Sequence, residues 1–165
     1  MVLRTPNKKA LVMLAIGFAF SCTAGVVFWA FCEAEQMAMQ TEALSRAKML
    51  SRSLLAYAED NDGYFPTDFG PGKFPKAALG PYAPHSDFEL VTQSVNPRSR
   101  DWAVNTYLKG IDVRHLDHSD RTLVVFDSLD WPNGRRCAAF ADGSAKRLAG
   151  QTVAHAYLKR NGVVE

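Results

Sequence analysis

The densest group of potential metal ligands in the chain is the short run His115, Asp117 and His118. Imidazole and carboxylate groups bind zinc, but a metal site needs three or more ligands that converge on one point with the right geometry. One polar loop with two histidines supplies too few. We therefore interpret this run as a solvated loop.

A second group of acidic residues precedes Gly63, and here Asp60 and Asp62 are candidates for calcium binding, because Ca²⁺ prefers carboxylate oxygens. The EF-hand pattern fails, however. With these two as the third and fifth ligands, the first would be Ala58 and the twelfth Phe69. Polar residues that end a helix, followed by a glycine in the left-handed conformation, fit the segment better.

No nucleophile in the chain has a supporting motif. The serines lack a G-x-S-x-G context, and there is no phosphate-binding glycine loop. Cys137 stands alone after the apolar segment, so we expect no disulfide within the domain and a buried thiol, with a disulfide to another chain as the alternative. The sequence therefore predicts no catalytic residues, no cofactor and no enzyme. A tethered hydrolase or ligand-binding domain would need a polar pocket that the sequence does not indicate.

The element that dominates the chain is a run of 23 uncharged residues from Ala10 to Cys32. As a helix it would be roughly 35 Å long, enough to cross a hydrocarbon core of about 30 Å. Trp29 lies near its outer end, where indole rings favour the interface. We predict a transmembrane helix over residues 10–32.

Charged residues on either side of this run predict its direction. Arg4, Lys8 and Lys9 precede it, whereas Glu33 and Glu35 follow it. By the positive-inside rule, residues 1–9 form a cytoplasmic tail, and the rest of the chain is exported. We expect a single-pass protein of the bacterial inner membrane with a periplasmic or extracellular domain.

Two other interpretations of the apolar run involve its removal or modification. A signal peptide has an apolar region of about 7–15 residues before a small-residue cleavage site, but this run is longer and has no good A-x-A site. A lipoprotein would use Cys22, but Ala19, Phe20 and Ser21 match the usual small, aliphatic box poorly. An uncleaved anchor fits better.

The expected partners are the lipid bilayer and other membrane subunits. Gly17, Ser21 and Gly25 offer a small-residue surface for contact with another helix. Of the 19 Lys and Arg residues, three precede the apolar run, which leaves 16 basic against 17 acidic side chains. Such a balance gives no reason to expect nucleic acid as a partner.

Helical periodicity continues beyond the membrane segment. Ala43, Ala47, Leu50, Leu54 and Tyr57 recur at spacings of four and three residues, as an apolar stripe does. No Gly or Pro interrupts the chain between positions 26 and 61. We predict one helix over residues 10–60, with an amphipathic half (33–62) whose stripe, above all Leu50, Leu54 and Tyr57, packs on a domain.

The rest of the chain predicts a Gly/Pro-rich loop and then a sheet. Residues 63–86 form the loop, with one helical turn near Lys76–Leu79, and residues 87–165 form the sheet region. The expected strands are 88–95, 102–108, 122–126, 136–141 and 144–149, and a short helix is expected at 152–160.

Asp142-Gly143 lies between the last two strands and predicts a two-residue type I′ turn. This turn would pair Ala141 with Ser144, and the residues beyond them in the same register.

Three motifs carry a resemblance to a known family. They are AYAEDNDGYFPTDFG (residues 56–70), AVNTYLKG (103–110) and CAAFADGSAKRL (137–148). Together with the long half-apolar helix, they resemble type IV pilins and type II secretion pseudopilins, in particular pilin-like proteins with a C-terminal Phe-Ala-Asp-Gly hairpin. The resemblance implies an α+β fold with the long helix packed on a small antiparallel sheet, and some pseudopilins bind calcium in a loop.

The chain departs from pilin precursors at the processing site. Precursors have a Gly-Phe junction before the apolar segment and a glutamate five residues into it, whereas this chain has Lys9-Ala10 and Leu14. Gly17-Phe18 lies inside the run. In the hairpin family a histidine precedes the aspartate by ten residues, and here that position is Pro132.

Two functions follow from these patterns. The first is a pilin-like structural or assembly protein, a minor or non-polymerising component of a secretion or pilus-type machine. The second, as an alternative, is an accessory single-pass scaffold subunit of another membrane complex, which the missing glutamate keeps open.

Overall fold

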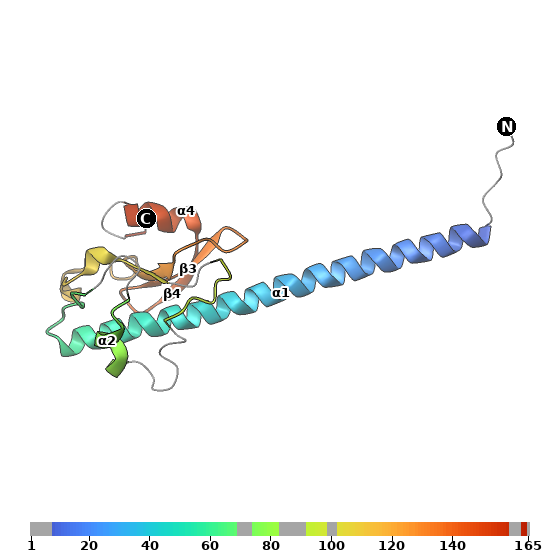
Figure 1. Cartoon of the computed structure of the whole chain (residues 1–165). Helices are drawn as coiled ribbons and strands as arrows, with labels where there is room; N and C mark the ends of the chain where they lie inside the picture. The colour runs from blue at the N-terminus through green and yellow to red at the C-terminus, as the bar shows by residue number, and fades with distance from the viewer. Residues whose placement is uncertain (1–7, 69–73, 83–91, 99–101, 159–162, 165) are drawn as a thin grey trace. The chain divides into compact units, whose positions relative to one another are not determined.

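The computed structural model describes residues 8–68, 74–82, 92–98, 102–158 and 163–164, and shows an α+β fold (Figure 1). The helices are α1 (Lys8–Asp60), α2 (Lys76–Leu79) and α4 (Gly150–Leu158), and the strands are β1 (Trp102–Val104), β2 (Leu123–Asp127), β3 (Arg135–Phe140) and β4 (Ala145–Ala149). Short 3₁₀ turns follow α2 and β1. The chain divides into two compact units at Ala38/Met39.

The helix α1 confirms the predicted long helix and begins two residues earlier than expected. It ends in a tight reversal at Asp62 and Gly63, whose φ angles are +55° and +89°. The amide of Gly63 donates a hydrogen bond of 2.7 Å to the carbonyl of Ala58, which satisfies one of the last carbonyls of the helix. The polar residues at this point therefore end the helix.

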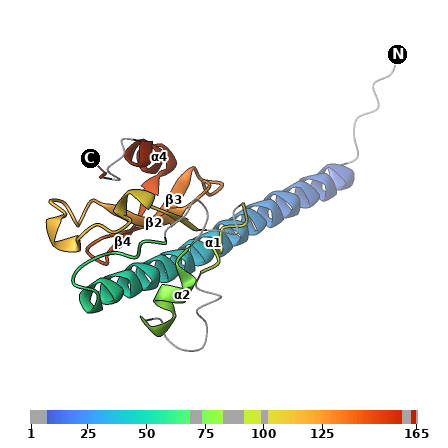
Figure 2. The same cartoon turned by 60° about the vertical axis from the view of Figure 1, so that its left-hand side comes forward.

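The second unit is built on a four-stranded antiparallel sheet in the order β1-β2-β3-β4. Two apolar clusters pack on it, one with α1 and one with α4 (Figures 1 and 2). A register irregularity between Leu123 and Val125 lets Val124 and Val125 join the α1 cluster, while Leu123 and Phe126 join the α4 cluster. The strand β2 is therefore buried throughout, as its unbroken apolar run indicates.

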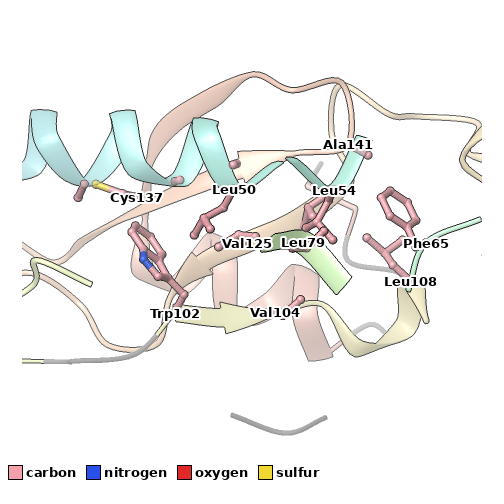
Figure 3. Packing of buried hydrophobic residues seen from close by; sticks show 14 of the residues in the cluster. Leu50, Leu54, Phe65, Leu79, Trp102, Val104, Leu108, Val125, Cys137 and Ala141 are labelled. Atoms are coloured by element: carbon pink, nitrogen blue, oxygen red, sulfur yellow. The ribbon is translucent and has the colours of Figure 1, made fainter. Parts of the chain in front are cut away.

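The core against α1 contains the predicted helical stripe. Leu50 and Leu54 point into it beside Val125 and Leu79 (Figure 3). The hydroxyl of Ser51 also donates a hydrogen bond of 2.6 Å to the carbonyl of Phe140. One face of this part of α1 is thus fixed to the sheet by both apolar packing and a buried hydrogen bond.

The strand expected at 102–108 is wrong in its second half, because β1 ends at Val104. Asn105 is fully buried. Its side-chain amide Nδ2 donates to the carbonyl of Leu123 at 2.8 Å, and its Oδ1 accepts from the backbone amide of Tyr107. These bonds turn the chain into a 3₁₀ helix, Thr106–Leu108. Most of the strand expected at 88–95 lies outside the described residues, and its described part, 92–95, forms no strand.

The C-terminal hairpin is present, but the predicted turn and register are wrong. Ala139 pairs with Ala145, and the loop has three residues, because Phe140 and Ser144 close it. Gly143 has a φ of +79°, whereas Asp142 is not in the left-handed region, so the turn is not type I′.

The physical reason for this difference lies outside the hairpin. The amide of Ala141 donates to the carbonyl of Thr122, and the amide of Asp142 donates to the carbonyl of Ser119. These bonds fix the loop backbone to the segment before β2. The Oδ1 of Asp142 accepts from the amide of Ser144 at 2.8 Å, so the aspartate still has a turn role.

The last helix also differs from the expectation in its start. It begins at Gly150, directly after β4, and Thr152 lies within its first turn instead of capping it. The amide of Gly150 donates to the carbonyl of Gly134, which joins the helix start to the turn before β3.

Candidate membrane anchor and buried polar cluster

The first unit exposes a continuous set of large apolar side chains on α1. The exposed fraction is 75% for Phe20, 72% for Phe28 and 67% for Trp29. In the part of the chain that the structure describes, one helix is long and apolar enough to cross a membrane, and this segment makes it so. Apolar exposure on this scale is unfavourable in water and favourable in lipid.

The backbone and polar groups of this segment are suited to an apolar solvent. Lipid offers no hydrogen-bond partners to backbone N–H and C=O groups, and a helix pairs these groups with one another. The hydroxyl of Thr23 donates to the carbonyls of Ala19 and Phe20 at 3.1 and 2.9 Å, so it too is satisfied within the helix.

The residues predicted for the anchor and its contacts all lie on this helix. Ala10 is helical, and Cys32 is exposed. At Gly17 and Gly25 no other atom comes within 4 Å of the position a side chain would take, and Ser21 is exposed as well. These small residues leave space along the helix that another chain could fill.

In the second unit the same helix has the opposite character. Leu50 and Leu54 are fully buried, and Tyr57 is half-buried with its ring edge-on to that of Tyr82 at 5.7 Å between centroids. These three side chains lie on one face, as predicted.

One fully buried carboxylate of the domain, Asp127, was not predicted from the sequence. It lies at the end of β2 and is fully buried. Its Oδ2 accepts hydrogen bonds from the Trp131 indole at 2.6 Å and the Cys137 amide at 2.8 Å, and its Oδ1 accepts from the Ser94 hydroxyl at 2.9 Å. Burial raises the pKa of the Asp127 carboxyl, and these hydrogen bonds oppose the rise.

Asp127 therefore joins three segments that are distant in sequence. It connects β2 to β3, to the Trp131 turn and to the segment at Ser94. A signal was present: a single aspartate ends an apolar run, and a tryptophan that needs an acceptor follows four residues later.

Cys137 lies beside this cluster, and its thiol is unreactive. Its thiol is 3.5 Å from the carbonyl of Gln40, to which it donates, and burial raises its pKa to about 12. A thiol in this state is protonated at neutral pH and is a poor nucleophile or metal ligand.

The predicted calcium candidates do not converge. Asp60 and Asp62 are exposed, and the carbonyl of Asp62 accepts from the Arg114 guanidinium at 2.7 Å. The same guanidinium forms an ion pair of 2.7 Å with Asp112. The positively charged Arg114 side chain already contacts these oxygens, so the arrangement favours an ion-paired loop over a calcium site.

The histidine run is also dispersed on the surface. The side chains of His115 and His118 are exposed, and His115 Nδ1 lies 3.2 Å from Asp112. Among the described residues, no group of three or more His, Cys, Asp or Glu side chains is placed to hold a metal ion.

Two surface hollows lie near candidate residues named from the sequence. One, of about 460 Å³, has Lys48, Arg52 and Asp142 among its lining residues, and the other, of about 360 Å³, has His115 and His118. Both are open and have walls of mixed polarity. The Ser144 hydroxyl in the first hollow has no hydrogen-bond partner among the described residues, and the Thr122 hydroxyl in the second donates to the backbone carbonyl of His118.

Comparison with known proteins gives no further assignment. No protein-family model, no curated protein sequence and no solved structure matches the chain.

Proposed function

We propose that this chain is a membrane-anchored, pilin-like structural or assembly protein, and that it is a minor or non-polymerising component of a secretion or pilus-type machine. Its first residues lie in the cytoplasm, the apolar part of α1 spans the inner membrane, and the second unit is exported.

One observation carries this proposal: a single uninterrupted helix exposes Phe20, Phe28 and Trp29 in one unit and buries Leu50 and Leu54 in the other. The exposed part has the length of a membrane span, and the buried part is the central packing element of a small domain. A helix of this kind anchors a domain and also serves as part of its core.

Three further features support a structural role. The fold has the α+β plan that the sequence motifs imply. The fully buried Asn105 and Asp127 form hydrogen bonds that hold separate segments of the domain together. The hairpin aspartate, Asp142, bonds to its own turn.

A second function follows from the start of the apolar segment. Lys9-Ala10 and Leu14 stand where pilin precursors have their cleavage junction and glutamate. An accessory scaffold subunit of a different membrane complex would need neither feature, so the two functions differ in their partners and share the anchor.

Purification of the full chain from native membranes in mild detergent, followed by mass spectrometry, tests both. The proposal predicts an intact N-terminus that retains Lys8 and Lys9, together with co-purifying subunits that carry pilin-like N-terminal helices. Co-purification with subunits of another kind would support the scaffold function. A mature N-terminus at Phe18 would contradict the uncleaved anchor.

A further inference from the structure

The loops at 96–98 and 129–135 lie at one end of the sheet, the end where Gln40 of α1 contacts β3. The Cys137 thiol is 3.5 Å from the Gln40 carbonyl, and Arg147 donates to the Thr41 hydroxyl at 2.8 Å. The strand β3 starts two residues before Cys137, so the turn that precedes β3 lies at this end. The hairpin glycine, Gly143, lies at the other end of β3.

The segment at 96–98 joins the same end of the sheet. The side-chain amide of Asn96 donates to the carbonyl of Leu129 at 2.9 Å, and the Oδ1 of Asn96 accepts from the amide of Arg98. We call residues 96–98 and 129–135 together the loop rim.

The loop rim is basic and partly apolar on its surface. Arg98 and Arg135 are exposed, and Leu129 is 50% exposed. The rim contains one carboxylate, Asp130, which already forms an ion pair of 2.5 Å with Arg136. The rim therefore exposes two guanidinium groups and an aliphatic side chain, and its one carboxylate is already paired with Arg136.

The chain keeps this rim close to the membrane if α1 is the anchor. Gln40 follows Cys32 by eight residues, which is about 12 Å of helix. This length limits the distance between the end of the apolar segment and Gln40, whatever the angle between the two units. It is comparable to the distance of roughly 8–10 Å over which charges at a membrane surface act at physiological ionic strength.

We propose that the loop rim docks on the headgroups of anionic phospholipids, with Arg98 and Arg135 on phosphate oxygens and Leu129 at the interface. Guanidinium groups bind phosphate through paired hydrogen bonds, and an aliphatic side chain gains by leaving water at the headgroup level. The inference rests on the proposed function, because it takes the membrane from the anchor.

The test uses the full chain in lipid nanodiscs, either neutral phosphatidylcholine alone or the same lipid with about a third phosphatidylglycerol. Amide hydrogen exchange is followed in residues 128–135. We expect exchange there to slow at least about threefold in the anionic discs alone, whereas residues 141–144 at the other end of the sheet exchange equally in both.

Variants and a phosphate control sharpen the test. The double variant Arg98→Gln/Arg135→Gln should lose the slowing, and Arg52→Gln, which removes an exposed arginine near the hairpin, should keep it. Exchange in β2 shows whether each variant is folded. Inorganic phosphate added to neutral discs should have no effect, and slowing there would assign the site to free anions.

If residues 128–135 of the wild-type chain exchange equally in neutral and anionic discs, the inference is overturned without any variant. A chain that does not enter discs at all would instead contradict the proposed anchor, so the two failures are distinguishable.

Discussion

The two parts of α1 have similar local signals and opposite surroundings. Both are free of helix breakers over most of their length, and both are rich in apolar residues. Before Ala38 large side chains such as Phe20 and Phe31 are about three-quarters exposed, whereas after Met39 the stripe of Ala43, Leu50 and Leu54 has no exposed surface. One helix therefore exposes apolar side chains in its first part and buries them in the domain core in its second part.

This difference teaches that pattern, and not apolar content alone, separates an anchor from a core helix. The first part is apolar around its whole circumference, as a helix is that lies in a membrane or inside a larger protein. The second part is apolar on one stripe and charged elsewhere, which a sheet can cover. Substitutions in the two parts should consequently have different readouts.

The largest effect is expected for Leu54→Asp, because an unpaired carboxylate would be buried on the core side of α1. We predict a loss of about 4–5 kcal/mol in the free energy of unfolding of the domain. Arg52→Asp, two residues away on the exposed side, should change it by less than about 1 kcal/mol. Urea denaturation of the detergent-solubilised protein measures both, and equal losses would show that this part of α1 does not pack as described.

A somewhat smaller effect is expected at the buried carboxylate. Asp127→Ala removes the acceptor of the Trp131 indole and the Cys137 amide, and we predict a loss of about 2–4 kcal/mol. Asp127→Asn keeps one oxygen for these donors, and its amide can donate to Ser94, so most of the stability should remain. Similar losses in the two variants would contradict the hydrogen-bonding role.

The hairpin should respond to changes in backbone conformation more than in chemistry. Gly143→Val places a β-branched residue at a φ of +79°, with its Cβ 3.4 Å from Leu55, and should cost roughly 1–3 kcal/mol. Asp142→Asn should be nearly silent in thermal unfolding, since Asn accepts the same bond from the Ser144 amide. If Asp142→Asn left folding intact and abolished partner assembly or metal binding, the aspartate would have a function beyond the turn.

The smallest effect concerns pH. The hydrogen bonds and charge of Arg114 lower the pKa of Asp112 below its ordinary value, so this pair stabilises the fold above about pH 4 and the contribution is lost as the pH falls below that. Asp112→Asn should lower the urea midpoint at pH 7 and have progressively less effect toward pH 2. A constant difference across this range would show that the ion pair does not contribute.

Much of the fold follows from local patterns in the sequence. The long helix, the buried strand β2 and the position of the last hairpin are each specified by residues within a single segment. The apolar stripe identifies Leu50 and Leu54 as core residues because helical periodicity needs no knowledge of the partner.

What could not be predicted depends on contacts between segments. The hairpin register is shifted by bonds from Ala141 and Asp142 to the segment at 119–122, and β1 ends early because Asn105 reaches Leu123. Two of the three donors to Asp127, Ser94 and Cys137, also come from other segments of the chain. Local propensity contains no term for such bonds.

The most direct test of the central claim is alkaline carbonate extraction of membranes from cells that express the full chain, with a chain that starts at Met39 as the control. If the first part of α1 is a membrane anchor and the second part belongs to the domain, the full chain stays in the membrane pellet and the shortened chain is found, folded, in the soluble fraction. Release of the full chain into the soluble fraction would contradict the account.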